Sequence, residues 1–179
     1  DADGDALAVT GASALHGSVT VNGDGTLTYK GDANHNGTDT ITYSISDGKG
    51  GTASSTVAVA VNAVNDAPVA SNTTATTPED TAIVLTPDVS DVDGDPLAIT
   101  SASASHGTVA INPDGTLTFT PDANYHGPAL ITYTVSDGTG GSATATIAVT
   151  VTAVNDAPVA SAPAISGPED TPISGAITT

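Results

Sequence analysis

The residues whose spacing suggests chemistry are aspartates at alternate positions of a short glycine-containing segment. The pattern Asp-x-Asp-Gly-Asp occurs twice, at Asp91, Asp93 and Asp95 and at Asp1, Asp3 and Asp5. Carboxylate oxygens are hard ligands, and alternate spacing turns them to one side of an extended chain, which favours Ca²⁺ over Zn²⁺. A polar turn is the alternative, because Asp and Gly are ordinary turn residues and no Glu completes an EF-hand loop at the twelfth position.

The composition excludes several classes of protein. The 179 residues include 20 acidic side chains against two lysines, Lys30 and Lys49, for a formal charge of −18. A nucleic-acid partner requires a basic face, and so does docking to an anionic membrane. No apolar run reaches the roughly 18 residues of a membrane span, so membrane insertion is not expected. The absence of Cys excludes disulfides and thiolate sites, and a mean hydropathy of +0.07 argues against disorder.

The chain contains an internal repeat with a period of 90 residues. Residues 1–70 align with 91–160 without a gap, and about 44 of the 70 positions are identical. Such a period indicates an array of similar domains, and we expect this chain to be one part of a longer array. We predict three segments: 1–65, a repeat lacking its first strands; 66–155, a complete repeat; and 156–179, the opening strands of a third repeat.

Within each repeat, apolar and polar residues alternate with the period of a β-strand. Ile131, Tyr133 and Val135, for example, are separated by Thr residues. Turn segments such as Asn112-Pro113-Asp114-Gly115 divide the runs. The predicted fold class is all-β, with tandem seven-stranded immunoglobulin-like sandwiches in an elongated array and no helix. The expected strands of the complete repeat are 69–76, 83–85, 97–99, 108–111, 117–119, 131–135 and 147–151.

Strand direction predicts where the acidic loops lie. Antiparallel strands enter a sandwich at one end and leave at the other, so the acids collect at both ends, and ends of neighbouring repeats meet in an array. Carboxylates at 4 Å repel by about 1 kcal/mol per pair even in water, so a cation is expected among them. The junction of the first two repeats is predicted to gather Asp32, Asn34, Asn65, Asp66, Asp91, Asp93, Asp95 and Asp137. The far end of the second repeat is predicted to gather Glu79, Asp80, Asp122, Asn124, Asn155 and Asp156. Related positions in the other copies are Asp1, Asp3, Asp5, Asp47, Glu169 and Asp170.

Some of these acids have a second interpretation. Glu79 and Glu169 are the only glutamates, which favours a ligand that needs reach, although a solvated loop residue is the alternative. Asp47 and Asp137 lie in Ser-Asp-Gly segments and are either ligands or turn residues. Asp114, like its copy Asp24, is interpreted as a plain hairpin-turn residue.

These motifs resemble a known family. Pro78-Glu79-Asp80, Asp91-Val92-Asp93 and the linker Asn65-Asp66-Ala67-Pro68 resemble the calcium signature of cadherins, in the same order. The repeat as a whole, from Asp-x-Asp-Gly-Asp through Ser-Asp-Gly-x-Gly-Gly to Val-Asn-Asp-Ala-Pro-Val-Ala, resembles the bacterial cadherin-like (VCBS-type) tandem repeats of large RTX-type adhesins. The resemblance implies cadherin-like sandwiches stiffened by Ca²⁺ in bacterial arrays that are secreted or attached to the cell surface. The chain departs from cadherins in its shorter linker and lacks their Asp-Arg-Glu loop, for which Asp122-Ala123-Asn124 stands in.

Three functions are compatible with these features. The first is a calcium-stiffened extracellular spacer that projects or links an adhesive structure, with neighbouring repeats of the array as its partners. The second is a subunit of a self-assembling filament, in which residues 157–179 of one copy complete the first repeat of another by strand addition. The third is a module that binds cell-surface glycan or other copies of itself. An enzyme is not expected, because no Gly-x-Ser-x-Gly motif is present and the carboxylates recur at domain ends every 90 residues.

Overall fold

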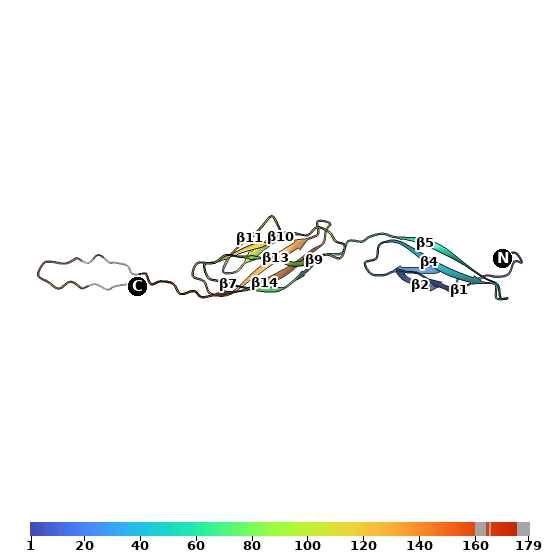
Figure 1. Ribbon diagram of the computed structural model, residues 1–179, viewed down its shortest axis with the longest axis horizontal. Coiled ribbons are helices and arrows are strands. Elements are labelled where there is room, and N and C mark those ends of the chain that lie inside the picture. The colour runs from blue at the N-terminus through green and yellow to red at the C-terminus, as the bar shows by residue number, and fades with distance from the viewer. Residues whose placement is uncertain (160–163, 165, 175–179) are drawn as a thin grey trace. The chain divides into compact units, whose positions relative to one another are not determined.

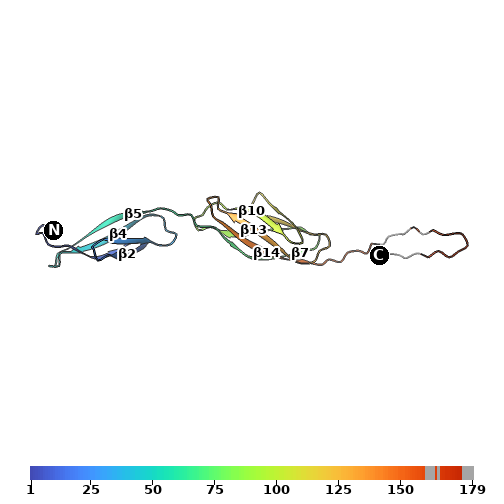
Figure 2. The same ribbon diagram turned by 180° about the vertical axis from the view of Figure 1, so that it is seen from behind.

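The computed structural model describes residues 1–159, 164 and 166–174. These residues form fourteen β-strands and no helix, which confirms the predicted all-β fold class (Figures 1 and 2). They group into two compact units: one comprises Asp1–Ala70, Val89–Ala98 and Val135–Ala143, and the other comprises the remaining described residues. The first unit therefore holds the first repeat, the linker and two loops of the second repeat.

The first repeat consists of five strands. Its main sheet has the order β1-β4-β5, with both pairs antiparallel and a bulge between Val9 and Gly11 of β1 (Figure 1). A separate antiparallel hairpin joins β2 to β3. The strands are β1 (Ala8–Ser13), β2 (Gly17–Val21), β3 (Leu27–Gly31), β4 (Gly37–Ser46) and β5 (Thr52–Val61).

The second repeat adds strands that the first repeat lacks. A four-stranded sheet has the order β10-β13-β14-β7 (Figure 2). A three-stranded sheet has the order β11-β12-β8, and β6 pairs with β9. The strands are β6 (Val69–Ser71), β7 (Thr73–Pro78), β8 (Ile83–Leu85), β9 (Asp88–Ser90), β10 (Ala98–Ala104), β11 (Gly107–Ile111), β12 (Leu117–Pro121), β13 (Gly127–Ser136) and β14 (Ser142–Thr152).

All seven predicted strand positions of this repeat are occupied, but the opening segment is divided in a way that the sequence did not predict. The expected strand 69–76 is interrupted at Asn72, because the Asn72 side-chain oxygen accepts hydrogen bonds from the backbone N–H of Thr146 (2.9 Å) and from its hydroxyl (3.1 Å). Before the interruption β6 pairs with β9, and after it β7 pairs with β14 in parallel. One segment therefore contributes to two sheets. A further short strand, β9, follows β8.

The described residues 156–159, 164 and 166–174 contain no strand. The other positions of the predicted opening strands, in the segment 156–179, lie outside the described residues. The assignment of this segment to a third repeat therefore rests on its sequence.

The hydrophobic core is well formed in the second repeat. Inward-facing side chains at alternate positions of β12, β13 and β14 are buried, which is the period expected for a sandwich. The strands β7 and β8 cover the edges of β14 and β12. The fully buried large side chains are Tyr133, Phe119, Leu117, Ile131, Ile147, Val135 and Val149.

The equivalent positions of the first repeat are exposed. Val57, which corresponds to Ile147, is 44% exposed, whereas Ile147 is 1% exposed. Among the described residues of this repeat, Ile41 is the one large apolar side chain that is buried. The described part of the first repeat has no counterpart of β7 or β8, so the outer edges of β5 and β3 are unpaired. Without such pairing in the described residues, Val57 contacts solvent although its counterpart Ile147 is buried.

This difference predicts unequal costs for the same truncation in the two repeats. Val149→Ala removes buried methyl groups and should lower the free energy of unfolding of the second repeat by about 2 kcal/mol. The matched change Val59→Ala, at the equivalent but half-exposed position, should cost less than about 1 kcal/mol. Urea unfolding followed by NMR peak intensities reports the stability of each repeat separately. If both variants lose the same free energy of unfolding, the difference in burial between Val149 and Val59 is contradicted.

Candidate metal centre at the linker

The Asp91–Asp95 loop is shaped by its own side chains. The Oδ1 atom of Asp91 accepts a hydrogen bond from the backbone N–H of Asp93 at 2.8 Å and a longer one from Asp95 at 3.5 Å. Gly94 has φ of +77°, a left-handed conformation that suits a residue without Cβ. Asp91, Asp93 and Asp95 each place a carboxylate oxygen within 4.8 Å of the other two. The three alternating aspartates therefore lie together in one loop.

The linker residues contact the same loop. The backbone N–H of Asp66 donates to Oδ2 of Asp93 at 2.7 Å. The hydroxyl of Thr139 donates to Oδ1 of Asn65 at 2.5 Å and to Oδ2 of Asp95 at 3.2 Å. These bonds bring the linker, the loop after β9 and the loop after β13 together within the first compact unit.

Asp137 anchors the linker rather than pointing freely into the site. Its Oδ2 accepts a hydrogen bond from the side-chain amide of Asn65 at 2.8 Å. Its Oδ1 accepts backbone N–H groups of Thr139, Gly140 and Gly141, which closes the loop after β13. The Asn65 amide, together with the backbone donors, lowers the Asp137 pKa from 3.8 to about 2. The Asp137 carboxylate thus closes its own turn and also holds the linker residue Asn65.

A cavity of about 310 Å³ opens beside the linker, and four predicted site residues line it. Its lining includes Asp32, Asn34, Asp66 and Asp93 together with His35, all from the first compact unit. Asn34 has φ of 59°, which an Asn tolerates better than most residues and which ends the turn after β3.

The donor set around Asp91 fits a hard divalent cation. Oδ2 of Asp91 is buried and has no hydrogen-bond partner, and a buried polar atom without a partner is costly. Three carboxylates within 4.8 Å repel one another, and no arginine exists in the sequence to neutralise them. Oxygen ligands in this number and of this charge match Ca²⁺ better than softer metals.

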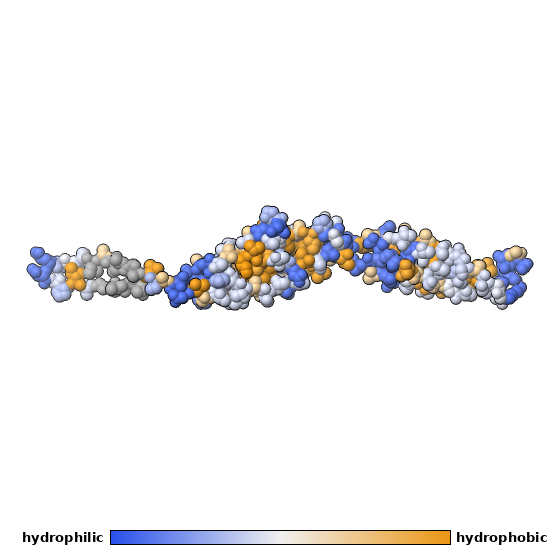
Figure 3. Space-filling model, in the orientation of Figure 1, coloured by the Kyte–Doolittle hydropathy of each residue, from blue (hydrophilic) through white to orange (hydrophobic). Residues whose placement is uncertain are grey.

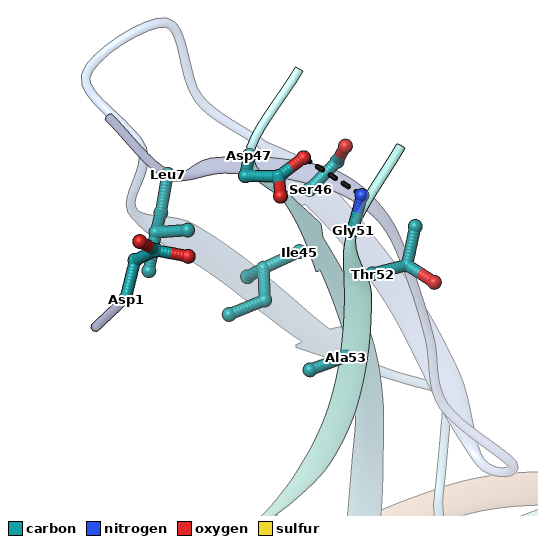
Figure 4. A pocket seen from close by; sticks show the side chains of 8 residues that line it. All are labelled: Asp1, Leu7, Ile45, Ser46, Asp47, Gly51, Thr52 and Ala53. Carbon is teal, nitrogen blue, oxygen red and sulfur yellow. Dashed lines mark hydrogen bonds between the residues drawn. The ribbon is translucent and has the colours of Figure 1, made fainter. Parts of the chain in front are cut away.

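The corresponding end of the first repeat has the same loop arrangement. Oδ1 of Asp1 accepts the backbone N–H of Asp3 at 2.8 Å and that of Asp5 at 3.4 Å. Asp47 closes its turn by accepting the N–H groups of Lys49 and Gly51. Asp1 and Asp47 face a pocket of about 260 Å³ that Figure 4 shows between them, with apolar side chains of β4 and β5 in its floor.

The far end of the second repeat gathers part of its predicted set. Glu79 is buried rather than solvated: its Oε1 accepts the N–H of Val154 at 2.5 Å, and its Oε2 lies 3.7 Å from Nδ1 of His126. Oδ1 of Asp80 accepts the backbone N–H of Asn124 at 3.0 Å. The carboxylates of these two acids therefore hold the linker start and the loop after β12.

Other predicted residues take no part in a described side-chain cluster. Asp122 holds its loop through its backbone, with its carbonyl accepting the N–H of Tyr125 at 3.1 Å. Asn155 and Asp156 are exposed and contact one another through the Asn155 side chain. Glu169 and Asp170 are exposed in a turn. That these residues bind a metal ion remains a prediction.

Asp39 in β4 is a polar site residue that the sequence did not single out. It is 2% exposed, and its carboxylate accepts the N–H of His16 at 3.0 Å, the hydroxyl of Tyr29 at 2.9 Å and two further backbone N–H groups. Burial opposes ionisation, but these hydrogen bonds outweigh it and lower the Asp39 pKa. The second repeat has Phe119 and Ala129 at the positions of Tyr29 and Asp39. This paired difference between the repeats is the sequence signal that could have indicated a contact between Tyr29 and Asp39.

The surface distribution agrees with the placement of the polar loops. Figure 3 shows hydrophilic residues in blue at the ends of each repeat and on a projecting loop midway along the second repeat, whereas the strands between are covered mainly by pale and orange atoms. On this face, the most hydrophilic residues therefore lie mainly in loops and linkers.

A comparison with family sequence models gives one decisive match. The model described as cadherin-like domain matches residues 1–62 and again residues 64–152. The chain belongs to the cadherin-like domain family. Cadherin-like domains are non-enzymatic, extracellular, adhesion-type modules, and they typically bind Ca²⁺. No curated protein sequence matches this cadherin-like chain significantly.

Among solved structures, a protocadherin supports the cadherin-like fold. A protocadherin gammaB7 EC3-6 cis-dimer is 18% identical with a TM-score of 0.51, and the match covers 82% of this chain and 40% of that one. Human desmocollin-1 ectodomain is 15% identical with a TM-score of 0.46 and coverages of 89% and 35%. An endo-fucoidan hydrolase of glycoside hydrolase family 107 is 23% identical with a TM-score of 0.40 and coverages of 86% and 24%. The chain thus spans about a quarter to two fifths of these structures.

Among the described residues, no helix is long and apolar enough to cross a bilayer.

The lowered pKa of Asp137 predicts an acid-dependent loss of stability. Because the folded pKa of about 2 lies below the ordinary value of 3.8, the ionised carboxylate stabilises the fold fully above about pH 4 and loses this effect as the pH falls to 2. Asp137→Asn removes the titrating group. The stability difference between the unaltered chain and this variant, measured by urea unfolding, should therefore shrink between pH 4 and pH 2. A difference that is constant over this range would contradict the assignment.

Proposed function

We propose that the chain is a calcium-stiffened extracellular spacer whose repeats project or link an adhesive structure. The observation that carries the proposal is the convergence of Asp91, Asp93 and Asp95 with the linker residues Asn65 and Asp66. A cation held by these carboxylates ties the linker to the loop after β9, because both then share one ion.

The mechanism is electrostatic. Without a cation, the clustered carboxylates repel and the buried Oδ2 of Asp91 lacks a partner, so the linker contacts are weakened. With Ca²⁺ supplying charge neutralisation, the oxygens of Asp91, Asp93, Asp95 and Asp66 are the ligands that we assign. Asp137 serves as the linker anchor, since its oxygens are already engaged by N–H donors. Stiffness follows because the linker no longer moves independently of the loop.

The wider context that we propose is a bacterial tandem array of the VCBS type in an RTX-type adhesin. Its support is the repeat motif from Asp-x-Asp-Gly-Asp to Val-Asn-Asp-Ala-Pro-Val-Ala, which recurs every 90 residues. Secretion into a medium rich in Ca²⁺ suits a chain with 20 acids and two lysines.

Calcium removal tests this function directly. At Ca²⁺ about 100 times the dissociation constant, binding adds about 2.7 kcal/mol, so a chelator should lower Tm by about 10 °C or more. Solution scattering should also report a shorter particle after chelation. Calorimetric scans with CaCl₂ and with chelator provide the measurement.

Two variants separate a site from general charge effects. The double variant Asp91→Asn with Asp93→Asn should lose most of the Ca²⁺ response. Asp114→Asn changes an acid of the same repeat whose carboxylate only closes a hairpin turn with Thr116, and it should keep the response. If the unaltered chain shows no Ca²⁺ dependence in either Tm or particle length, the spacer function is wrong.

A second candidate function is a filament subunit, and the strand pairing among the described residues is compatible with it. Among the described residues, no strand pairs with the outer edge of β3 or of β5, and Val57 is exposed where Ile147 is buried. The segment 156–179 repeats the sequence pattern of 66–89, which supplies β6 to β9 in the second repeat. Addition of this segment from another copy is a recognised way to complete an open sheet.

Sedimentation velocity tests the filament. The 17.2 kDa chain should form oligomers whose size rises with concentration, and a chain ending at Asn155 should stay monomeric. A full chain that remains monomeric at millimolar concentration rules out assembly by this route. The spacer function does not depend on the outcome.

A further inference from the structure

The two Asp-x-Asp-Gly-Asp loops have the same backbone arrangement. The first aspartate of each accepts the N–H of the third residue at 2.8 Å, in Asp1 as in Asp91. Gly4 and Gly94 both have φ of +77°. Any difference in how these loops hold a cation must therefore come from the groups around them.

The neighbouring loops differ at one position that touches the acids. Position 49 is Lys and the equivalent position 139 is Thr. The ammonium of Lys49 lies 2.5 Å from Oδ1 of Asp5, whereas the hydroxyl of Thr139 donates to Asp95 at 3.2 Å. The last aspartate of the loop is thus paired with a full positive charge in one repeat and with a neutral hydroxyl in the other.

The acids themselves also differ in arrangement. Asp91, Asp93 and Asp95 form a group of three converging oxygens, and no such group is found at Asp1 to Asp5 in the described chain. The Asp5 side chain, 23% exposed, is held instead by the Lys49 side chain, which is 70% exposed. Lys49 stands where a cation is expected and supplies one charge from within the chain.

A tethered ammonium opposes a second cation at the same carboxylates. Ca²⁺ must either displace Lys49 from Asp5 or bind beside it against like-charge repulsion. The tether keeps the ammonium near the loop at a concentration that dilution does not lower. Thr139 imposes no such opposition, because it carries no charge.

We propose that Lys49 is a built-in counter-cation that weakens Ca²⁺ binding at the Asp1–Asp3–Asp5 loop. The charge at position 49 or 139 then shifts the Ca²⁺ concentration at which the loop beside it responds. This inference rests on the proposed function, since it assumes that Asp-x-Asp-Gly-Asp loops bind Ca²⁺.

Reciprocal substitutions test the proposal within the whole chain. In a CaCl₂ titration followed by ¹H–¹⁵N NMR, the amides of Gly4 and Gly94 report the two loops separately. Lys49→Thr should lower the midpoint at Gly4 by about tenfold and leave Gly94 unchanged. Thr139→Lys should raise the midpoint at Gly94 by a similar factor. Raising the salt concentration should reduce both effects, because screening weakens exposed charges.

Matched controls isolate the charge at this position. Lys30→Thr makes the same change of net charge in β3, away from both loops, and should alter neither midpoint by more than about twofold. Thr139→Val removes the hydroxyl bonds to Asn65 and Asp95 without adding charge, so the effect of Thr139→Lys beyond that of Thr139→Val is electrostatic.

The outcomes distinguish the role of Lys49 from the proposed calcium-dependent function on which it rests. If Gly94 of the unaltered chain does not respond to Ca²⁺, the proposed function fails and the role of Lys49 fails with it. If Gly94 responds but Lys49→Thr leaves the Gly4 midpoint unchanged, or Lys30→Thr shifts it equally, only the role of Lys49 is overturned. A shift confined to Gly4 in Lys49→Thr supports it.

Discussion

Repulsion among carboxylates is the constraint on which the loops and linker of this protein depend. With 20 acids against two lysines, ion pairing cannot neutralise the loops. N–H donors do part of this work: Asp137 and Asp39 both accept several hydrogen bonds, which lower their pKa values. The acids that lack enough donors, above all Asp91 with its unpartnered Oδ2, are those that gather beside the linker. The linker position and the candidate metal centre are therefore consequences of the same excess of charge.

Sheet completion is the second constraint, and it explains why similar sequences are buried so differently. In the second repeat, β7 and β8 add to β14 and β12, and the inward residues of those strands are covered. In the described first repeat the matching edges are unpaired, so Val57 contacts solvent although its sequence environment is nearly that of Ile147. In the second repeat, β7 and β8 therefore contribute to the burial of the core strands that they flank.

The small differences between the copies carry as much information as their identity. Tyr29 and Asp39 replace Phe119 and Ala129 together, because the buried carboxylate needs the tyrosine hydroxyl as a donor. Lys49 replaces Thr139 beside the acidic loop and pairs with Asp5. A repeat protein can in this way keep the same loop backbone in each repeat and vary the local electrostatics through single neighbouring residues.

The sequence alone determined the all-β class, the 90-residue repeat and the gathering of Asp91, Asp93 and Asp95, because these depend on period-2 alternation and on local turn geometry. It did not reveal the interruption at Asn72, the burial of Glu79 or the role of Asp39. Those features depend on partners far along the chain: Thr146 for Asn72, Val154 for Glu79 and His16 for Asp39. Likewise, only the tertiary structure decided that Lys49 faces Asp5. Hydrogen bonds and ion pairs between distant segments have no period in the sequence, so they appear only when the sheets are assembled.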